Sequence, residues 1–198
     1  MYIPKHFKIT DNETLYQFIQ DNNFGQIISL SHSQFCCTHI PFLLTANKDK
    51  LLGHMALANH QHQDIDKQEV LIIFTGPHDY ISPSWYQGNG VPTWNYQALH
   101  VYGQCTTFND AEKLKSVVDS LSNKHESQFK KPWKPDYQAK MLSAIVGVEI
   151  QISKIECQFK LSQNKSIKDQ QNVVRQLRMN HSSELAQAME HSLSKLNK

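Results

Sequence analysis

The sequence predicts an α+β fold in which helices flank a small β-barrel. Short apolar, β-branched runs recur along much of the 198-residue chain, and most are separated by turns, so the order is not the βαβ succession of a parallel sheet. Two capping-box patterns mark the starts of helices. A late apolar run changes phase in its middle, as strands do at the corners of small barrels.

The first half of the chain predicts one helix followed by strands. Thr10 and Glu13 have capping-box spacing and apolar residues follow at helical intervals, which indicates a helix over about 11–21. Proline cannot donate to a ladder, so Pro41 requires an edge position or a bulge in its strand. The expected strands cover 26–30, 35–44, 51–58, 70–74 and 97–105.

The second half predicts helices around one long strand. Asn109-Asp110-Ala111-Glu112 begins an amphipathic helix over about 110–123. In the strand over 146–161 the apolar residues change phase, which requires a bulge near Ser153-Lys154. A third helix after the linker 129–135 should turn these side chains inward: Tyr137, Met141, Leu142 and Ile145.

The last segment, 166–198, reads as helical with a break near Asn180-His181-Ser182. Its apolar stripes must cover another surface, either the barrel or a partner subunit. We therefore expect a barrel domain over 1–165 and a C-terminal helical extension over 166–198.

Composition restricts the class of protein. The formal charge is only +2, from 20 basic and 18 acidic side chains, so DNA binding would need a local patch, and the lysines between 113 and 140 are scattered among acids. Four cysteines form no CxxC pair, and the opening Met1-Tyr2-Ile3-Pro4 has no apolar leader pattern. No apolar run has the length of a membrane span. These features predict a cytoplasmic protein with reduced thiols and no membrane partner.

Three stretches contain residues that are unusual for routine packing. They are 37–42, which is followed by Gly53-His54-Met55-Ala56; 76–86; and 91–96, which leads to His100. These stretches resemble the signature blocks of the PaiB family of FMN-binding-domain proteins, often described as negative transcriptional regulators. The opening 1–4 and the late blocks 144–150 and 159–166 match as well, so the resemblance spans nearly the whole chain in the expected order.

The resemblance implies a homodimeric split β-barrel related to pyridoxine-phosphate oxidases, with FMN bound at the subunit interface. It implies hydrogen-bond donors beside the flavin ring at Thr38 and His39, phosphate contacts at His54 and Asn59, and stacking walls at the aromatic residues. The cofactor-binding residues expected from these blocks are Thr38, His39, His54, Met55, Asn59, Trp85, Tyr86, Trp94, Asn95, Tyr96 and His100. Considered from the residues alone, His39 also fits an ordinary hydrogen-bonded barrel histidine, and Trp94 and Tyr96 fit core aromatics.

The chain departs from the family pattern at one informative place. The family block usually reads Gly-His-Met-Ala-Arg-Ala-Asn-Pro, whereas this chain has Leu57 in place of the arginine and His60 in place of the proline. Arginine is the natural bidentate partner of a phosphate. Its replacement leaves His54, His60 or His62 to meet the FMN phosphate.

Other kinds of site have weaker patterns. His54, His60 and His62 form a loose histidine set without a carboxylate or cysteine at supporting spacing, so no metal is expected. The sequence singles out no nucleophile, general acid or general base. Three functions therefore remain open: a transcriptional regulator with bound flavin, a flavin-dependent oxidoreductase acting on a small molecule, and a flavin-free dimeric interaction module.

Overall fold

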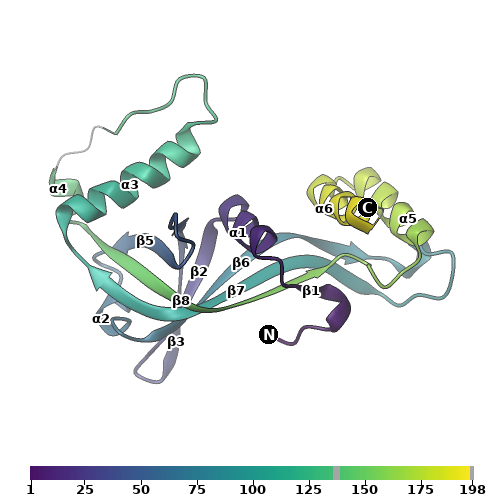
Figure 1. Cartoon of the computed structure of the whole chain (residues 1–198), viewed down its shortest axis with the longest axis horizontal. Coiled ribbons are helices and arrows are strands. Elements are labelled where there is room, and N and C mark those ends of the chain that lie inside the picture. Colours follow the sequence, from purple (N-terminus) through teal and green to yellow (C-terminus); the bar gives the residue numbers. More distant parts are fainter. Residues whose placement is uncertain (136–138, 197–198) are drawn as a thin grey trace. The chain divides into compact units, whose positions relative to one another are not determined.

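The computed structural model describes residues 1–135 and 139–196, which form one eight-stranded sheet with flanking helices (Figure 1). The strands are β1 (Lys8–Ile9), β2 (Phe24–Ser31), β3 (Gln34–Pro41), β4 (Leu43–Leu44), β5 (Lys50–Ala56), β6 (Glu69–Ile81), β7 (Thr93–Phe108) and β8 (Ile145–Lys160). The helices are η1 (Lys5–Phe7), α1 (Asn12–Asp21), α2 (Gln61–Asp64), η2 (Pro83–Trp85), α3 (Ala111–Glu126), α4 (Ala139–Leu142), α5 (Ile167–Met179) and α6 (Ser183–Leu196).

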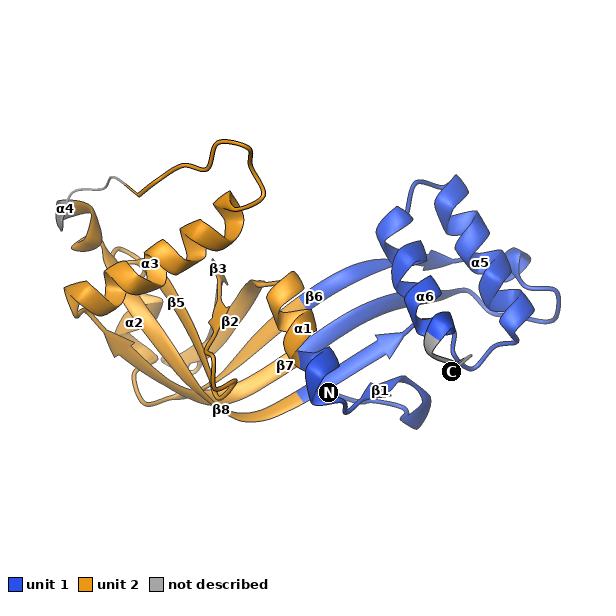
Figure 2. Ribbon diagram, turned by 45° about the horizontal axis from the view of Figure 1, so that its top comes forward, with its two compact units in different colours: residues 1–15, 75–99, 156–198 blue, residues 16–74, 100–155 orange. Residues whose placement is uncertain are grey.

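The strand order is β3-β2-β6-β7-β8-β5-β4, with β1 paired to β8. The chain separates into two compact units, and the long strands β6, β7 and β8 contribute residues to both (Figure 2). Unit 1 holds residues 1–15, 75–99 and 156–198, and unit 2 holds 16–74 and 100–155.

Unit 2 encloses an apolar core because its strands alternate buried and exposed side chains. Strand β2 pairs with β3 and β6 so that Ile27 lies opposite Thr38 on one side and Ile72 on the other. The rings of Phe42 and Phe74 meet edge to face at 5.8 Å between centroids within this core. Alternation along paired strands gives this unit one core-facing side and one outward-facing side of β2, β3, β6 and β7.

Unit 1 is built around the helical hairpin α5–α6. Ser166 caps α5 by accepting a hydrogen bond from the backbone amide of Asp169, and His181, with a φ of 64°, allows the turn between the two helices. The apolar stripes of both helices bury Val173, Leu177, Leu185 and Met189 against Ile81 and Leu161. The C-terminal helices thus pack on the strand ends of their own unit.

Several predicted elements were confirmed, and some bounds changed. Strands β6 and β7 are much longer than 70–74 and 97–105, while the third helix is only the single turn α4. Ile145, which was expected to face inward on that helix, begins β8 instead, and Tyr137 lies outside the described residues. Pro41 ends β3, as a residue without an amide donor should.

Candidate functional site

The outward-facing side of the unit 2 sheet carries a row of apolar and aromatic side chains. Phe35 is 81% exposed and Phe24 is 64% exposed, although large apolar side chains normally avoid water. We call this surface the outer face. It consists of Phe24, Gln26, Ile28, Leu30, Phe35, Cys37, His39, Leu71, Ile73, His100 and Tyr102.

His39 lies on the outer face, where a ligand can reach its side chain. It pairs with Gln26 across the β2–β3 ladder, and its imidazole stacks on the Phe24 ring with 6.2 Å between centroids and 30° between planes. The side chain is exposed. It therefore offers a hydrogen-bonding group beside an aromatic surface, which is the combination that a flavin ring needs.

His100 and Tyr102 extend the outer face onto β7. Their neighbours Leu99, Val101 and Gly103 are buried, so alternation turns both rings outward. The two rings lie 6.5 Å apart edge to face. The Lys154 ammonium group lies 5.2 Å from the Tyr102 ring centroid, which brings a positive charge to the same face.

Thr38 lies on the opposite side of β3 from His39, within a hydrogen-bonded polar cluster. Asn59 Nδ2 donates to Thr38 Oγ1 at 2.8 Å, and Thr38 Oγ1 donates to Gln61 Oε1 at 2.5 Å. Asn59 Oδ1 accepts from the Gln61 backbone amide, and the Asn59 carbonyl lies 2.6 Å from His62 Nδ1. The structure thus brings Thr38 and Asn59 together but directs them away from His39.

Gln61 organises this cluster, and sequence reasoning missed it. It is only 4% exposed, and its Nε2 lies within hydrogen-bond distance of Ile27 O, Ser29 Oγ and Cys36 O. The amide therefore joins α2 to both β2 and β3. A glutamine between two histidines in a polar segment looks like surface, so no local pattern indicates this burial.

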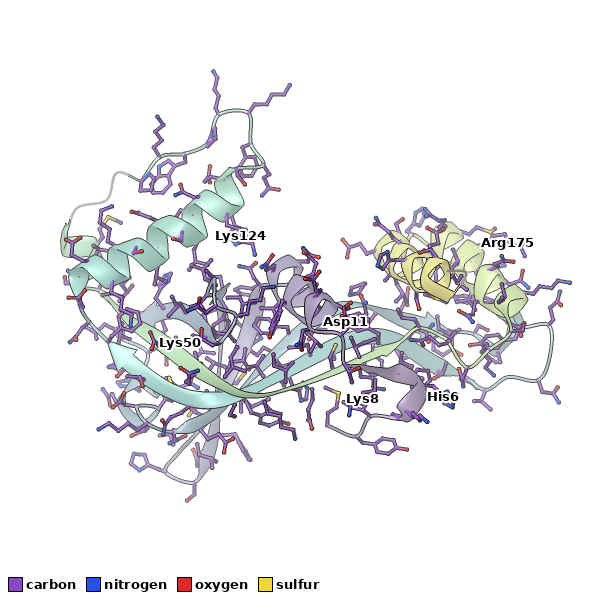
Figure 3. All side chains as sticks on the ribbon, in the orientation of Figure 1. His6, Lys8, Asp11, Lys50, Lys124 and Arg175 are labelled. Carbon is purple, nitrogen blue, oxygen red and sulfur yellow. The ribbon has the colours of Figure 1, made fainter. Side chains whose placement is uncertain are left out.

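The structure also separates His54 from the cluster. Its cross-strand neighbour in the β5–β8 ladder is Gly147, on the side where α3 packs on β5. On that side Glu149 accepts hydrogen bonds from Lys113 of α3 and from Lys50, which is labelled in Figure 3. His54 is half-buried, and its Nδ1 has no hydrogen-bond partner among residues 1–135 and 139–196.

Two neighbours of His54 are fixed by core packing. A Cβ placed on Gly147 would lie 2.2 Å from the Phe108 ring, so only glycine leaves room for that ring. Met55, the next residue, is 2% exposed and belongs to the core. Neither His54 nor Met55 is presented on the outer face.

The burial of His54 predicts a pH dependence of stability. Burial lowers the pKa of His54 below its ordinary value, so the unfolded chain binds this proton more readily and stability is lost as the pH falls through the range between the two pKa values. Replacing His54 with glutamine should flatten the acid side of the stability profile, by at most one proton, or about 1.4 kcal/mol per pH unit. Urea unfolding between pH 7 and pH 5 measures this slope. His60→Gln, the same replacement at an exposed position, is the matched control. If stability changes with pH equally steeply in wild type and in His54→Gln, the buried His54 does not cause the pH dependence.

The remaining predicted site residues belong to unit 1. Trp85 and Tyr86 pack against the α5–α6 cluster, and Lys165 lies 4.8 Å over the Tyr86 ring. Asn95 is 1% exposed, and its Nδ2 lies 2.9 Å from Ser162 Oγ and 3.4 Å from Met189 Sδ. These three side chains hold the helical hairpin to the strand ends.

Trp94 and Tyr96 occupy a different environment from these packed residues. Trp94 is 54% exposed, and its ring meets the Tyr80 ring edge to face at 6.2 Å. Tyr96 is half-buried. Of the unit 1 residues expected to bind a cofactor, Trp94 is thus the one most accessible to a ligand.

The described part of the chain supports neither a metal site nor a membrane-spanning helix. Within it, no group of three or more His, Cys, Asp or Glu side chains is arranged to hold a metal ion. Its helices include none with both the length and the apolar character needed to cross a bilayer.

Comparison with known sequences identifies the family. A family model described as "Putative FMN-binding domain" matches residues 1–154. The chain is 35% identical over 206 residues to "Protease synthase and sporulation protein PAI 2" of Bacillus subtilis (strain 168), an alignment that covers 98% of this chain and 99% of that protein. An uncharacterised protein of Aspergillus fumigatus is 30% identical over 233 residues, covering 88% of this chain and 89% of its own.

Solved structures with low sequence identity share the fold. A flavocytochrome, Anf3 of Azotobacter vinelandii, superimposes with a TM-score of 0.60 at 16% identity, over 80% of this chain and 72% of its own. An FAD- and heme-binding protein of Mycobacterium smegmatis gives 0.61 at 12% identity, over 82% and 78% of the two chains. The family model and the near-full-length match together show that the chain belongs to the PaiB family of FMN-binding-domain proteins, with the split-barrel fold and the FMN cofactor that this membership gives.

Proposed function

We propose that this chain is a homodimeric FMN-binding protein in which the flavin ring lies on the outer face, and that the bound flavin serves a regulatory role. The observation that carries the proposal is the composition of this face, where exposed aromatic and apolar side chains alternate with hydrogen-bonding ones. A flavin ring requires both, an apolar surface for its faces and donors for its carbonyl and nitrogen edge.

The residues of the outer face fit the flavin ring. Phe24, Phe35 and Tyr102 supply aromatic surface, while His39 and Gln26 supply polar groups on the same side of the sheet. Bound there, FMN would supply reversible electron and hydride transfer. The residues of the outer face would orient the ring and exclude water from one of its two faces.

The FMN phosphate needs a hydrogen-bonding or positively charged partner, and the segment that follows β5 is where the family has its arginine. At the position of that arginine this chain has Leu57, a side chain that is 48% exposed. Thr38 and Asn59 already bind each other and Gln61. We therefore propose His60 or His62, which follow Leu57 in the sequence, as the phosphate contacts, in place of His54.

A second copy of the chain accounts for the exposure of the outer face. Three of its large apolar side chains, Phe24, Leu30 and Phe35, are 64%, 47% and 81% exposed in one chain. A contiguous apolar surface of this kind is typical of a subunit interface. Covering it with its own symmetry mate would bury these side chains and place the flavin between two copies.

The regulatory role is supported by sequence similarity. The Bacillus subtilis protein, 35% identical across almost its whole length, is named for protease synthesis and sporulation, which are cell-wide processes rather than a single chemical reaction. A flavin that reports redox state would suit such a role. Binding of the dimer to DNA is one way in which it could act.

Flavin-dependent reduction of a small molecule is the second candidate. It is favoured by the exposed imidazole of His39, which could deliver a proton next to a reduced ring.

The experiment that tests the proposal is the visible spectrum of the freshly purified protein, before and after addition of FMN and gel filtration. We expect oxidised-flavin absorbance that stays with the protein and FMN release on denaturation. A colourless protein that does not take up FMN would overturn the proposal and leave the flavin-free interaction module. Turnover with NADH or NADPH would favour the oxidoreductase, and salt-resistant retardation of DNA would favour the regulator.

Restoring the family arginine should strengthen FMN binding. In Leu57→Arg an exposed apolar side chain is replaced by a guanidinium able to bind a phosphate with two hydrogen bonds. We expect FMN affinity to rise about 10-fold or more, with little change for riboflavin, which lacks the phosphate. Flavin fluorescence quenching measures both constants, and Leu57→Gln is the uncharged control. An equal gain for both flavins would show that residue 57 does not reach the phosphate.

A further inference from the structure

The segment that follows α3 in unit 2 carries three lysines whose charges are not neutralised in the described part of the chain. Lys130, Lys131 and Lys134 are all exposed. Within the residues that the structure describes, no carboxylate forms an ion pair with any of the three. Three unpaired cations within five residues make a local positive patch on a protein whose formal charge is only +2.

The lysines of α3 itself are different, because each is paired with an acid. Lys113 Nζ lies 2.7 Å from Glu149 Oε2, and Lys115 Nζ lies 2.6 Å from Asp119 Oδ2. The structure therefore sorts lysines that look scattered in the sequence into two groups. Those of α3 are neutralised, and those of the following segment are free to meet another anion.

Two exposed aromatic side chains are interleaved with the unpaired lysines. Phe129 is 55% exposed and Trp133 is 50% exposed. The run Phe129-Lys130-Lys131-Pro132-Trp133-Lys134 thus alternates planar rings with positive charges and contains no acidic residue. Aromatic rings between cations are the combination with which proteins bind nucleic acid strands, the rings stacking on bases and the cations meeting phosphates.

Hydrogen bonds to the end of α3 hold this segment in place. Glu126 accepts twice, at its carboxylate from the Trp133 backbone amide at 2.6 Å and at its carbonyl oxygen from the Phe129 amide at 2.9 Å. Gln128 Nε2 donates to the His125 carbonyl oxygen at 2.8 Å. Both aromatic residues are therefore tied through their backbones to the same glutamate. A segment already ordered in this way loses less conformational entropy when a ligand binds.

The partial cover of the two rings limits the choice of ligand. Phe129 and Trp133 are each about half exposed, so part of each ring lies against the protein and part is open. A stacked base needs only one open ring face, whereas insertion into a bilayer requires the apolar side chain to enter the headgroup and acyl boundary. In a duplex the bases already stack on each other. A single strand offers both phosphates and open base faces.

We propose that residues 128–134, which we call the basic aromatic loop, bind single-stranded nucleic acid. Phe129 and Trp133 stack on bases, while Lys130, Lys131 and Lys134 contact phosphates. All of these residues belong to unit 2, and the segment lies away from the strands of that unit (Figures 1 and 2). The inference goes beyond the proposed function, because the loop needs no flavin to bind a strand.

Fluorescence anisotropy of a labelled oligothymidylate of about 12 nucleotides measures this binding to the full-length protein. We expect log K to fall with log salt with a slope of about −2, because three lysines each displace a counterion from the strand. Lys131→Met should weaken binding about 3- to 10-fold at low salt and reduce the slope to about −1.4. Lys115→Met, which removes a lysine already paired with Asp119, is the matched control and should change neither value.

The aromatic residues should affect affinity without affecting the salt dependence. Phe129→Leu and Trp133→Leu each remove a stacking ring but no charge, and the Trp133 backbone amide that binds Glu126 remains. We expect each to weaken binding about 5- to 100-fold with an unchanged slope. Urea unfolding of each variant, which should match wild type because both rings are exposed, shows that the fold is intact.

Three results would overturn the inference. They are no binding of the oligonucleotide, equal binding by wild type and Lys131→Met, and equal affinity for the strand and for a duplex of the same length, which would indicate attraction to phosphates alone. Sedimentation with phosphatidylcholine–phosphatidylserine vesicles provides the fourth comparison. If the protein binds these vesicles and not the oligonucleotide, the loop is a membrane contact and the inference is wrong. Oligonucleotide binding by a protein that takes up no FMN would reject only the proposed function.

Discussion

Replacing Phe35 with aspartate should convert the protein into a folded monomer that no longer retains FMN. Phe35 is 81% exposed in a single chain, so its loss removes little from the folding of that chain. In a dimer built on the outer face, the aspartate would be a buried charge without a partner. We expect the dimer dissociation constant to rise more than about 100-fold.

Sedimentation velocity measures the assembly, and flavin absorbance of the same fractions measures retention. Ala46→Asp is the matched control, because it adds the same charge at an exposed turn of unit 2 away from the outer face. A wild-type protein that sediments as a monomer at all concentrations would rule out the homodimer. A Phe35→Asp variant that stays dimeric and flavin-bound would place the interface on another surface.

Thiol alkylation gives an independent view of the same interface. Cys37 is exposed on the outer face, so the proposed wild-type dimer should protect it from alkylation, and Phe35→Asp should make it reactive. Cys105 and Cys157 provide the internal control. Burial raises the pKa of each of these thiols to about 12, so neither should react in the folded protein of either variant.

Replacing Gln61 with leucine should lower the free energy of unfolding by about 2–4 kcal/mol. Leucine has a similar volume but cannot bond Thr38, Ser29 or the carbonyl groups of Ile27 and Cys36. Those buried polar atoms would lose a hydrogen-bond partner, and the free energy lost exceeds the stabilisation that the added apolar contact provides. Urea unfolding of the apo protein measures the loss.

Gln63→Leu is the matched control for this change. Gln63 lies two residues further along α2 and is exposed, so its replacement should change stability by less than about 0.5 kcal/mol. If both variants unfold at the wild-type urea concentration, the α2 amide does not hold β2 and β3 together.

Local pattern was sufficient to predict most of the fold. Alternation in β7 and the phase change in β8 were readable because each depends on neighbouring residues, and the exposed pair Ser153-Lys154 marks the phase change in the structure. The end of β6 was not readable. The predicted strand covered only 70–74, yet β6 runs to Ile81, and Pro77 lies beyond residues 71–73 that pair with β2.

The site was harder to predict because its geometry depends on contacts distant in sequence. That Thr38 and His39 face opposite ways follows from alternation and could have been read from the sequence. The position of His54 beneath α3 could not, since it depends on a helix that starts more than fifty residues later. The same is true of Gln61, whose partners come from two strands formed earlier in the chain.

Strand β3 lies at one end of the hydrogen-bonded strand order of the described residues, and it carries Phe35 and other residues of the outer face. If the proposed dimer forms on this face, a newly made chain exposes both a strand edge and an apolar surface until its partner binds, and both features promote aggregation. Correct pairing and aggregation would then compete for the same molecules. We expect the yield of soluble protein to depend on how quickly two monomers associate. Slow expression with ample FMN should therefore give more native protein than rapid expression without it.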